Sequence, residues 1–195
     1  RQSGTCFMQQ FFQHLQKVAL IFIISVSALG REPLSPHIHG KAELHIVMDG
    51  SQLLVELNSP AMNLLGFEHA IHNSEDQTMV ENTRIHLENS NAFFIFNDGK
   101  CQLKEQNVDF SNILKASEHK HHEIHGQDNG HHTNSHKDIE ATYLYLCEEP
   151  NSLHSARVLL FDIFPNITSL HVQWIIHNQQ GTNTLNHKHN DITFR

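Results

Sequence analysis

The sequence of 195 residues lacks the motifs that mark common enzymes. It contains no glycine-rich phosphate-binding loop, no Gly-x-Ser-x-Gly nucleophile motif and no His-Glu-x-x-His metalloprotease motif. It has only 13 lysine and arginine residues against 21 acidic residues, and the basic residues form no cluster. This balance argues against binding to nucleic-acid phosphates or to anionic membranes. We therefore expect neither an enzyme nor a nucleic-acid-binding protein.

Long apolar runs are also scarce. The clearest run, 18–26, follows Lys17 and ends in small residues, which is typical of a secretory signal peptide. It is too short for a stable membrane span, although a retained anchor is the alternative. We predict a leader over residues 1–30, with Met8 as a candidate true start, and a metal-binding domain over 31–195 with no stable membrane anchor after processing.

Cysteine is rare, with three residues in the chain. Removal of the leader takes Cys6 away and leaves Cys101 and Cys147, an even pair in an exported protein. We predict a disulfide between them, worth about 4 kcal/mol in the loop-entropy model. Two unrelated buried thiols are the alternative. The bridge is expected to close the base of the segment between the cysteines, so that deleting that segment spares the fold.

The pattern of apolar residues predicts an α+β fold, a strand-dominated single domain with antiparallel hairpins, one main helix and a disordered histidine-rich loop. The first hairpin is expected to turn at Asp49-Gly50, which places Glu43 opposite Glu56. A capping box at Ser74 predicts the helix, which should end near Glu88. Further strand-like segments cover 93–96, 102–110, 139–147, 157–163 and 168–177, and a final hairpin covers 181–194.

What the sequence does have is histidine, with 19 residues. Neutral imidazole is a good ligand for zinc. The densest group is too polar to bury a core, so we predict a mobile loop over 118–137 that collects or buffers zinc; a solvated, pH-responsive loop is the alternative. Its seven histidines are His119, His121, His122, His125, His131, His132 and His136.

Two short motifs predict an ordered zinc site. His37 and His39 are two residues apart, so in an extended chain both rings lie on one side and can approach one ion. Glu68 and His69 add a carboxylate and an imidazole before the predicted helix, and His72 follows. Together the two motifs could supply the four ligands of tetrahedral zinc. The predicted strand-face histidines His45, His171 and His177 are interpreted as ordinary surface residues. His187 and His189 in the final hairpin can be interpreted in the same way.

The sequence resembles the ZrgA-type zinc-regulated periplasmic proteins of Gram-negative bacteria in four segments: 36–44 (PHIHGKAEL), 58–70 (NSPAMNLLGFEHA), 161–165 (FDIFP) and 170–174 (LHVQW). The resemblance covers nearly the whole domain after the leader. It implies zinc binding in the periplasm in support of uptake, and no catalytic activity. It also places His37, His39, Glu68 and His69 on the family's most regular metal-capable motifs.

The sequence thus predicts a periplasmic zinc-binding protein whose partners are zinc ions and a zinc uptake transporter or its binding protein. Two other classes stay open. One is a zinc-dependent hydrolase, which needs an open coordination position and a carboxylate base. The other is a secreted interaction protein whose histidines sense pH. Copper or nickel would bind imidazole at least as well as zinc, so residue type alone does not identify the metal.

Overall fold

The computed structural model describes residues 38–114 and 137–195. The predicted leader, His37 and the seven histidines of the predicted loop lie outside these residues. Strands dominate the described part of the chain and helices are few, which confirms the predicted strand-dominated α+β class. The strands are β1 Lys41–Asp49, β2 Gln52–Pro60, β3 Phe94–Asn97, β4 Cys101–Asp109, β5 Asp138–Cys147, β6 Ser155–Val158, β7 Ser169–Ile176, β8 Gln179–Leu185 and β9 Asp191–Thr193. The helices are α2 Ala61–Leu65, α3 Ser74–Glu88, α4 Ser111–Leu114 and α5 Leu160–Ile163, with single 3-10 turns at Ser90–Ala92 and Pro150–Ser152.

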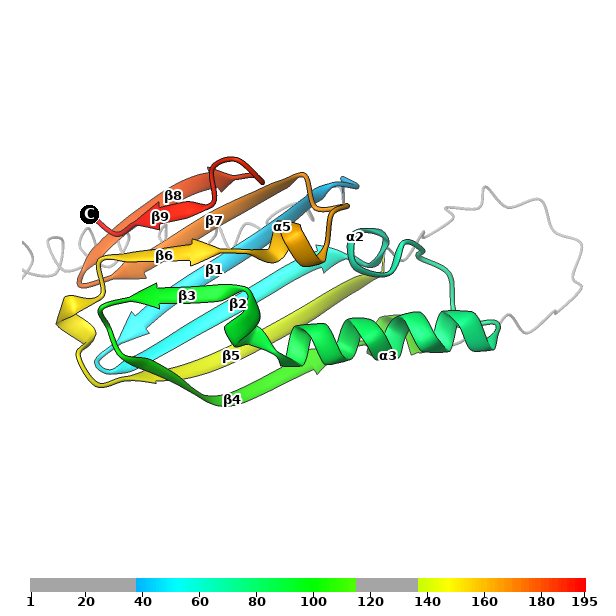
Figure 1. Ribbon diagram of the computed structural model, residues 1–195, viewed down its shortest axis with the longest axis horizontal. Helices are drawn as coiled ribbons and strands as arrows, with labels where there is room; N and C mark the ends of the chain where they lie inside the picture. The colour runs from blue at the N-terminus through cyan, green and yellow to red at the C-terminus, as the bar shows by residue number, and fades with distance from the viewer. Residues whose placement is uncertain (1–37, 115–136) are drawn as a thin grey trace, which may run out of the picture. The chain divides into compact units, whose positions relative to one another are not determined.

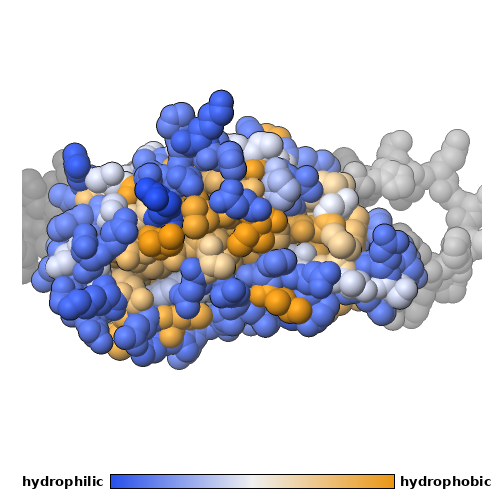
Figure 2. Space-filling model, in the orientation of Figure 1, coloured by the Kyte–Doolittle hydropathy of each residue, from blue (hydrophilic) through white to orange (hydrophobic). Residues whose placement is uncertain are grey.

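The strands form two sheets (Figure 1). The larger has the order β4-β5-β2-β1-β7-β8 and the smaller has the order β3-β6-β9. All pairs are antiparallel except β1 with β7. In Figure 1 the smaller sheet and α3 lie in front of the larger sheet, and Figure 2 shows apolar residues gathered along the middle of this front face.

The core lies between the two layers. The rings of Phe94 and Phe96 in β3 pack edge-on against Tyr143 and Tyr145 in β5, with centroid distances of 5.6 and 4.9 Å. The Tyr143 hydroxyl donates to the Leu87 carbonyl oxygen at 2.8 Å. The Tyr145 hydroxyl donates to the Ser90 hydroxyl at 2.7 Å. Both tyrosine hydroxyls therefore have partners although the residues are fully buried, as buried polar groups require.

The first hairpin forms as predicted, but its register differs. Ile46 pairs with Val55 and Asp49 with Gln52, so Gly50 and Ser51 form the turn. Gly50 has φ +59°, which fits the first central position of a II′ turn. Each β1 residue therefore pairs two positions further along β2 than the predicted turn requires. Because side chains alternate between the two faces with a period of two, the same residues still form the apolar face. Glu56 therefore lies opposite His45, and its predicted pairing with Glu43 is wrong.

The main helix ends at Glu88 as predicted, but it begins one residue earlier because a different residue caps it. The Asn73 side-chain oxygen accepts from the Asp76 backbone N–H at 2.8 Å, so Asn73 is the N-cap. Ser74, predicted to cap the helix, is its first residue. Asparagine and serine cap about equally well, and the extended backbone of Asn73 (φ −149°) settles the position.

Two predictions for the C-terminal part are wrong. Residues 157–163 do not form one strand, because β6 ends at Val158 and α5 begins at Leu160. The final hairpin over 181–194 does not form, because β8 pairs with β7 in the larger sheet while β9 pairs with β6 in the smaller one. Strands β8 and β9 are therefore neighbours in sequence that belong to different layers.

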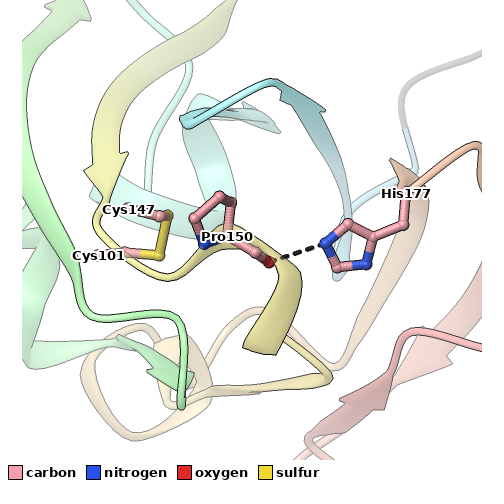
Figure 3. The surroundings of a disulfide bond; sticks show 4 residues. All are labelled: Cys101, Cys147, Pro150 and His177. Carbon is pink, nitrogen blue, oxygen red and sulfur yellow. Dashed lines mark hydrogen bonds between the residues drawn. A yellow bond between two sulfur atoms is a disulfide. The ribbon is translucent and has the colours of Figure 1, made fainter.

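The predicted disulfide is present between Cys101 and Cys147 (Figure 3). It joins the first residue of β4 to the last residue of β5. The segment that connects β4 to β5 lies at the opposite end of this strand pair, where Asp109 pairs with Glu140. The expectation that the bridge closes the base of that segment is therefore wrong, since a full strand pair separates them.

Of the helices in residues 38–114 and 137–195, none is long and apolar enough to cross a membrane.

Candidate metal-binding site

His39 lies in a turn immediately before β1. The Lys41 backbone N–H donates to the Ile38 carbonyl oxygen at 3.0 Å, and Gly40 has φ +84°, a conformation that favours glycine. The chain from Ile38 to Gly40 is therefore not extended, although the sequence argument for His37 and His39 assumed that it was. Because His39 lies in a turn, the argument that His37 and His39 share one side of an extended chain does not apply to it.

Gly40 also packs too closely for any larger residue. Its carbonyl oxygen accepts from the backbone N–H groups of Thr168 and Ser169 at 2.8 and 3.0 Å. A Cβ atom at this position would lie 2.8 Å from the Thr168 hydroxyl oxygen. The turn that carries His39 is thereby fixed against the start of β7.

The side chain of Asn63 ties α2 to the same turn. Its oxygen accepts from the Gly40 N–H at 2.7 Å, and its NH₂ group donates to the Lys41 carbonyl oxygen at 2.8 Å. The NH₂ group also contacts the Ser59 hydroxyl at 3.2 Å. Asn63 is 2% exposed, so these bonds replace the water that a buried amide would lose. They hold the residue before β1 next to the segment that follows α2.

That segment carries Glu68. Helix α2 ends at Leu65, and the capping residue Gly66, with φ +82°, turns the chain in the left-handed conformation typical of a helix C-terminus. The His39 Nε2 atom then lies 3.0 Å from the Glu68 Oε1 atom, and the side chains are 58% and 26% exposed. The structure therefore brings together two of the four predicted ligands, from positions 29 residues apart.

His69 points into a different group of side chains. Its ring stacks between those of Phe67 and His72, with centroid distances of 4.5 and 5.1 Å. Its Nδ1 atom donates to the Ala70 carbonyl oxygen at 2.8 Å and lies 3.8 Å from the Asp76 Oδ2 atom. His69 thus has a carboxylate neighbour of its own, apart from the pair formed by His39 and Glu68.

The carboxylate of Asp76 was not predicted as part of this region. It sits in the first turn of α3 and accepts from the His72 backbone N–H at 2.9 Å. Its position three residues after the cap Asn73, together with two histidines just before the helix, is the signal that could have revealed it.

The remaining histidines in the described part are scattered. His45 Nδ1 lies 3.9 Å from Glu56 Oε2 on the solvent side of the larger sheet, and His171 contacts Gln173 at 3.4 Å. His177 is not on a strand face as predicted, because it has φ +53° in the turn between β7 and β8. Its Nε2–H donates to the Pro150 carbonyl oxygen at 2.7 Å (Figure 3).

Within 38–114 and 137–195, no three histidine, cysteine, aspartate or glutamate side chains are grouped closely enough to hold a metal ion together. The pairs nevertheless have the right chemistry, since imidazole and carboxylate are both zinc ligands. In tetrahedral zinc, two such ligands about 2.0–2.1 Å from the metal lie about 3.3 Å apart. The 3.0 Å between His39 and Glu68 is within a few tenths of an ångström of that spacing.

These features define a strand-dominated domain that presents imidazole–carboxylate pairs at its surface. Residues 36–194 match the model of the ZrgA family zinc uptake proteins, and the chain belongs to this family. Its role therefore lies in zinc uptake, and the family is not one of enzymes. No curated protein matches the chain.

Proposed function

We propose that this protein captures zinc in the periplasm for uptake and that His39 and Glu68 provide the first two ligands. The observation that carries the proposal is the 3.0 Å contact between His39 Nε2 and Glu68 Oε1. A proton shared by these atoms occupies the place that a zinc ion would take. Exchange of that proton for the metal needs only a slight opening of the pair.

Further ligands are available from neighbouring residues. His69 follows Glu68 directly and can turn toward the pair if its ring gives up the contact with Ala70 at 2.8 Å. His37 precedes His39 by two residues and lies outside the described residues. We propose both as the third and fourth ligands.

The exposure of the pair suits a protein that must release its metal. His39 is more than half exposed, so a recipient protein can approach zinc there without unfolding the domain. The buried Asn63 holds the backbone at Gly40, while the side chains of His39 and Glu68 remain free to change partners. We propose a zinc uptake transporter or its binding protein as the recipient.

The seven histidines of the segment 118–137 are proposed as a second, less selective zinc store. The support for this role is compositional, because many imidazoles in a polar segment can bind zinc in several arrangements. Ordering such a segment costs conformational entropy, so its affinity per ion should be lower than that of a preformed pair.

The periplasmic location is supported by chemistry. The Cys101–Cys147 disulfide fits an oxidising compartment, where such bonds form and persist. The predicted leader over residues 1–30 agrees with export. A catalytic role is not proposed, since the sequence carries no motif for one and the family is described by uptake.

Zinc titration calorimetry tests the proposal. The titration uses the full chain and a variant lacking residues 118–136, so that the histidine-rich segment cannot mask a single tight site. In the shortened background, His39→Ala and Glu68→Gln are each expected to weaken the tight event at least 10-fold. His45→Ala is the matched control, because His45 also has a glutamate neighbour, at 3.9 Å.

The control should change affinity less than twofold. An unchanged tight event in both His39→Ala and Glu68→Gln would overturn the proposed site. If the shortened background shows no tight event at all, zinc capture belongs to the histidine-rich segment.

A further inference from the structure

The two edges of the larger sheet differ in how they are protected. Strand β4 forms one edge and contains Lys104, Glu105 and Asp109, with a register irregularity between Leu103 and Glu105. Charged side chains and bulges are usual means by which a protein keeps an edge strand from pairing with another chain. The edge strands of the smaller sheet, β3 and β9, have only 4 and 3 residues, and a short edge is protected as well.

Strand β8 forms the other edge of the larger sheet and has none of these features (Figure 1). Its sequence, QQGTNTL, includes no charged residue and no proline, and its pairing with β7 runs without an irregularity. In the described part of the chain, no strand pairs with its outer side. An edge of this kind presents backbone N–H and carbonyl groups to which another strand can bond.

The turn between β7 and β8 decides which backbone groups face outward. His177 and Asn178 have φ +53° and +61°, as in a two-residue type I′ turn. Such a turn is closed by a hydrogen-bonded pair, here Ile176 with Gln179, and bonded and non-bonded pairs then alternate along the two strands. The backbone groups that point away from β7 therefore belong to Gln180, Thr182 and Thr184.

The inner side of β8 is fixed by Trp174. The indole ring packs on Gly181, where a Cβ atom would lie 2.4 Å from a ring carbon, and its Nε1–H donates to the Asn183 side-chain oxygen at 3.0 Å. Leu185, at the end of the strand, is 2% exposed. Because β8 is already held as an extended strand, pairing with a further strand costs little additional ordering.

The outward residues of β8 fit a second copy of the same strand. Two antiparallel β8 strands related by a twofold axis at Thr182 place Thr182 opposite Thr182, and Gln180 opposite Thr184. Outward backbone groups then meet outward backbone groups along the strand. No charges oppose each other, and threonine pairs are favourable across antiparallel strands.

We propose that two copies of this protein pair through β8, so that their larger sheets join into one continuous sheet. The inference stands apart from zinc binding, since β8 contains no proposed ligand. The contact is a single strand pair, and each copy has a formal net charge of -8. The dimer should therefore be weak, dissociate on dilution and become stronger as salt screens the repulsion.

Sedimentation equilibrium of the full chain over a range of concentrations tests the proposal. A chelator in the buffer prevents zinc from linking copies through histidines. The original chain should change from monomer toward dimer as its concentration rises. Thr182→Lys places two like charges opposite each other at the twofold axis and should weaken the dimer at least 10-fold. Gln173→Lys is the matched control and should change the affinity less than twofold, because Gln173 is the exposed partner of Thr182 on β7, one strand away from the edge.

A charge swap separates loss of the contact from damage to the strand. An equimolar mixture of the Thr182→Lys and Thr182→Glu chains should form dimers again, because opposite charges then meet at the axis. In the original chain, amide hydrogen exchange at Thr182 should slow as the concentration rises, since its N–H is bonded only in the dimer.

A monomer at every concentration up to about 1 mM would overturn the proposal. A dimer that Thr182→Lys leaves unchanged would also overturn it, because another surface then joins the copies. Equal weakening by Thr182→Lys and Gln173→Lys would do the same, since the effect would come from added charge and not from the edge.

Discussion

The two ends of the larger sheet are held in different ways. At the disulfide end, Cys101 is bonded to Cys147, whose backbone N–H donates to the Ser51 carbonyl oxygen at 2.8 Å. At the other end, which we call the histidine end, His39 and Glu68 meet through side chains that stay partly open to solvent. One end is fastened covalently, and the other is positioned by hydrogen bonds that can be exchanged.

The difference separates stability from function. A covalent bond and buried aromatic rings stabilise the fold at the disulfide end without offering a ligand. Exposed imidazole and carboxylate groups at the histidine end add little stability, since exposed ion pairs contribute at most about 1 kcal/mol. Substitutions at the two ends should therefore affect different measurements.

The largest expected effect is on stability at the disulfide end. Replacing both cysteines, Cys101→Ala with Cys147→Ala, opens a ring that spans 46 positions and should cost about 4 kcal/mol. For a domain of this size that lowers the melting temperature by roughly 8–16 °C. Calorimetric melting measures the loss, and zinc affinity measured at 15 °C should stay within twofold. A drop in zinc affinity in the folded variant would show that the ends are coupled.

The next effect tests how the histidine end is positioned. Asn63→Ala leaves the Gly40 N–H and the Lys41 carbonyl without their partner, which should cost about 3 kcal/mol. Zinc affinity should fall at least fivefold, because His39 is no longer fixed beside Glu68. Urea unfolding and zinc titration of the folded protein measure the two effects.

Asn166→Ala serves as the control for Asn63→Ala. Asn166 is exposed and makes a single contact of 3.5 Å with the Met62 carbonyl oxygen, so its loss should cost less than about 0.5 kcal/mol. Normal zinc affinity in Asn63→Ala would mean that the buried asparagine serves the fold and does not position the site.

The smallest effect is a pH dependence of the buried tyrosines near the disulfide end. Burial raises the pKa of Tyr145 to about 12 and raises that of Tyr143 further. In the unfolded chain these tyrosines ionise near their ordinary pKa of about 10. Their contribution to the free energy of unfolding is therefore present below pH 10 and is lost as pH rises from 10 toward 12. At pH 11 each tyrosine should cost about 1.4 kcal/mol.

Tyr145→Phe should remove about half of that alkaline loss. Urea unfolding at pH 9 and pH 11 compares the variant with the original chain, and absorbance at 295 nm follows tyrosine ionisation directly. An equal alkaline loss in both proteins would assign the pH dependence to other groups.

Much of the fold could be predicted because strand alternation is local. The buried faces of β1, β2 and β7 follow from a period of two, and the wrong hairpin register kept them correct because it was shifted by an even number. The pairing of β9 with β6 could not be predicted, because a short strand carries no signal for which sheet it joins. The predicted hairpin assumed that neighbours in sequence pair, and here they do not.

The candidate site was predicted by residue type and not by geometry. His39, Glu68 and His69 were named as ligands, yet only the fold shows that His39 meets Glu68 while His69 stacks on Phe67 and His72. Asn63 was missed because a polar residue in a short helix gives no sign that it is buried. Two of its three hydrogen bonds are to residues more than 20 positions away, which a single sequence does not reveal.

The central claim is that His39 and Glu68 bind zinc together. A crystal structure of the zinc-loaded protein, with anomalous data collected at the zinc absorption edge, tests it most directly. The account predicts an anomalous peak about 2.0–2.2 Å from both His39 Nε2 and a Glu68 carboxylate oxygen. Zinc peaks elsewhere on the chain, with His39 and Glu68 still hydrogen-bonded to each other, would contradict it.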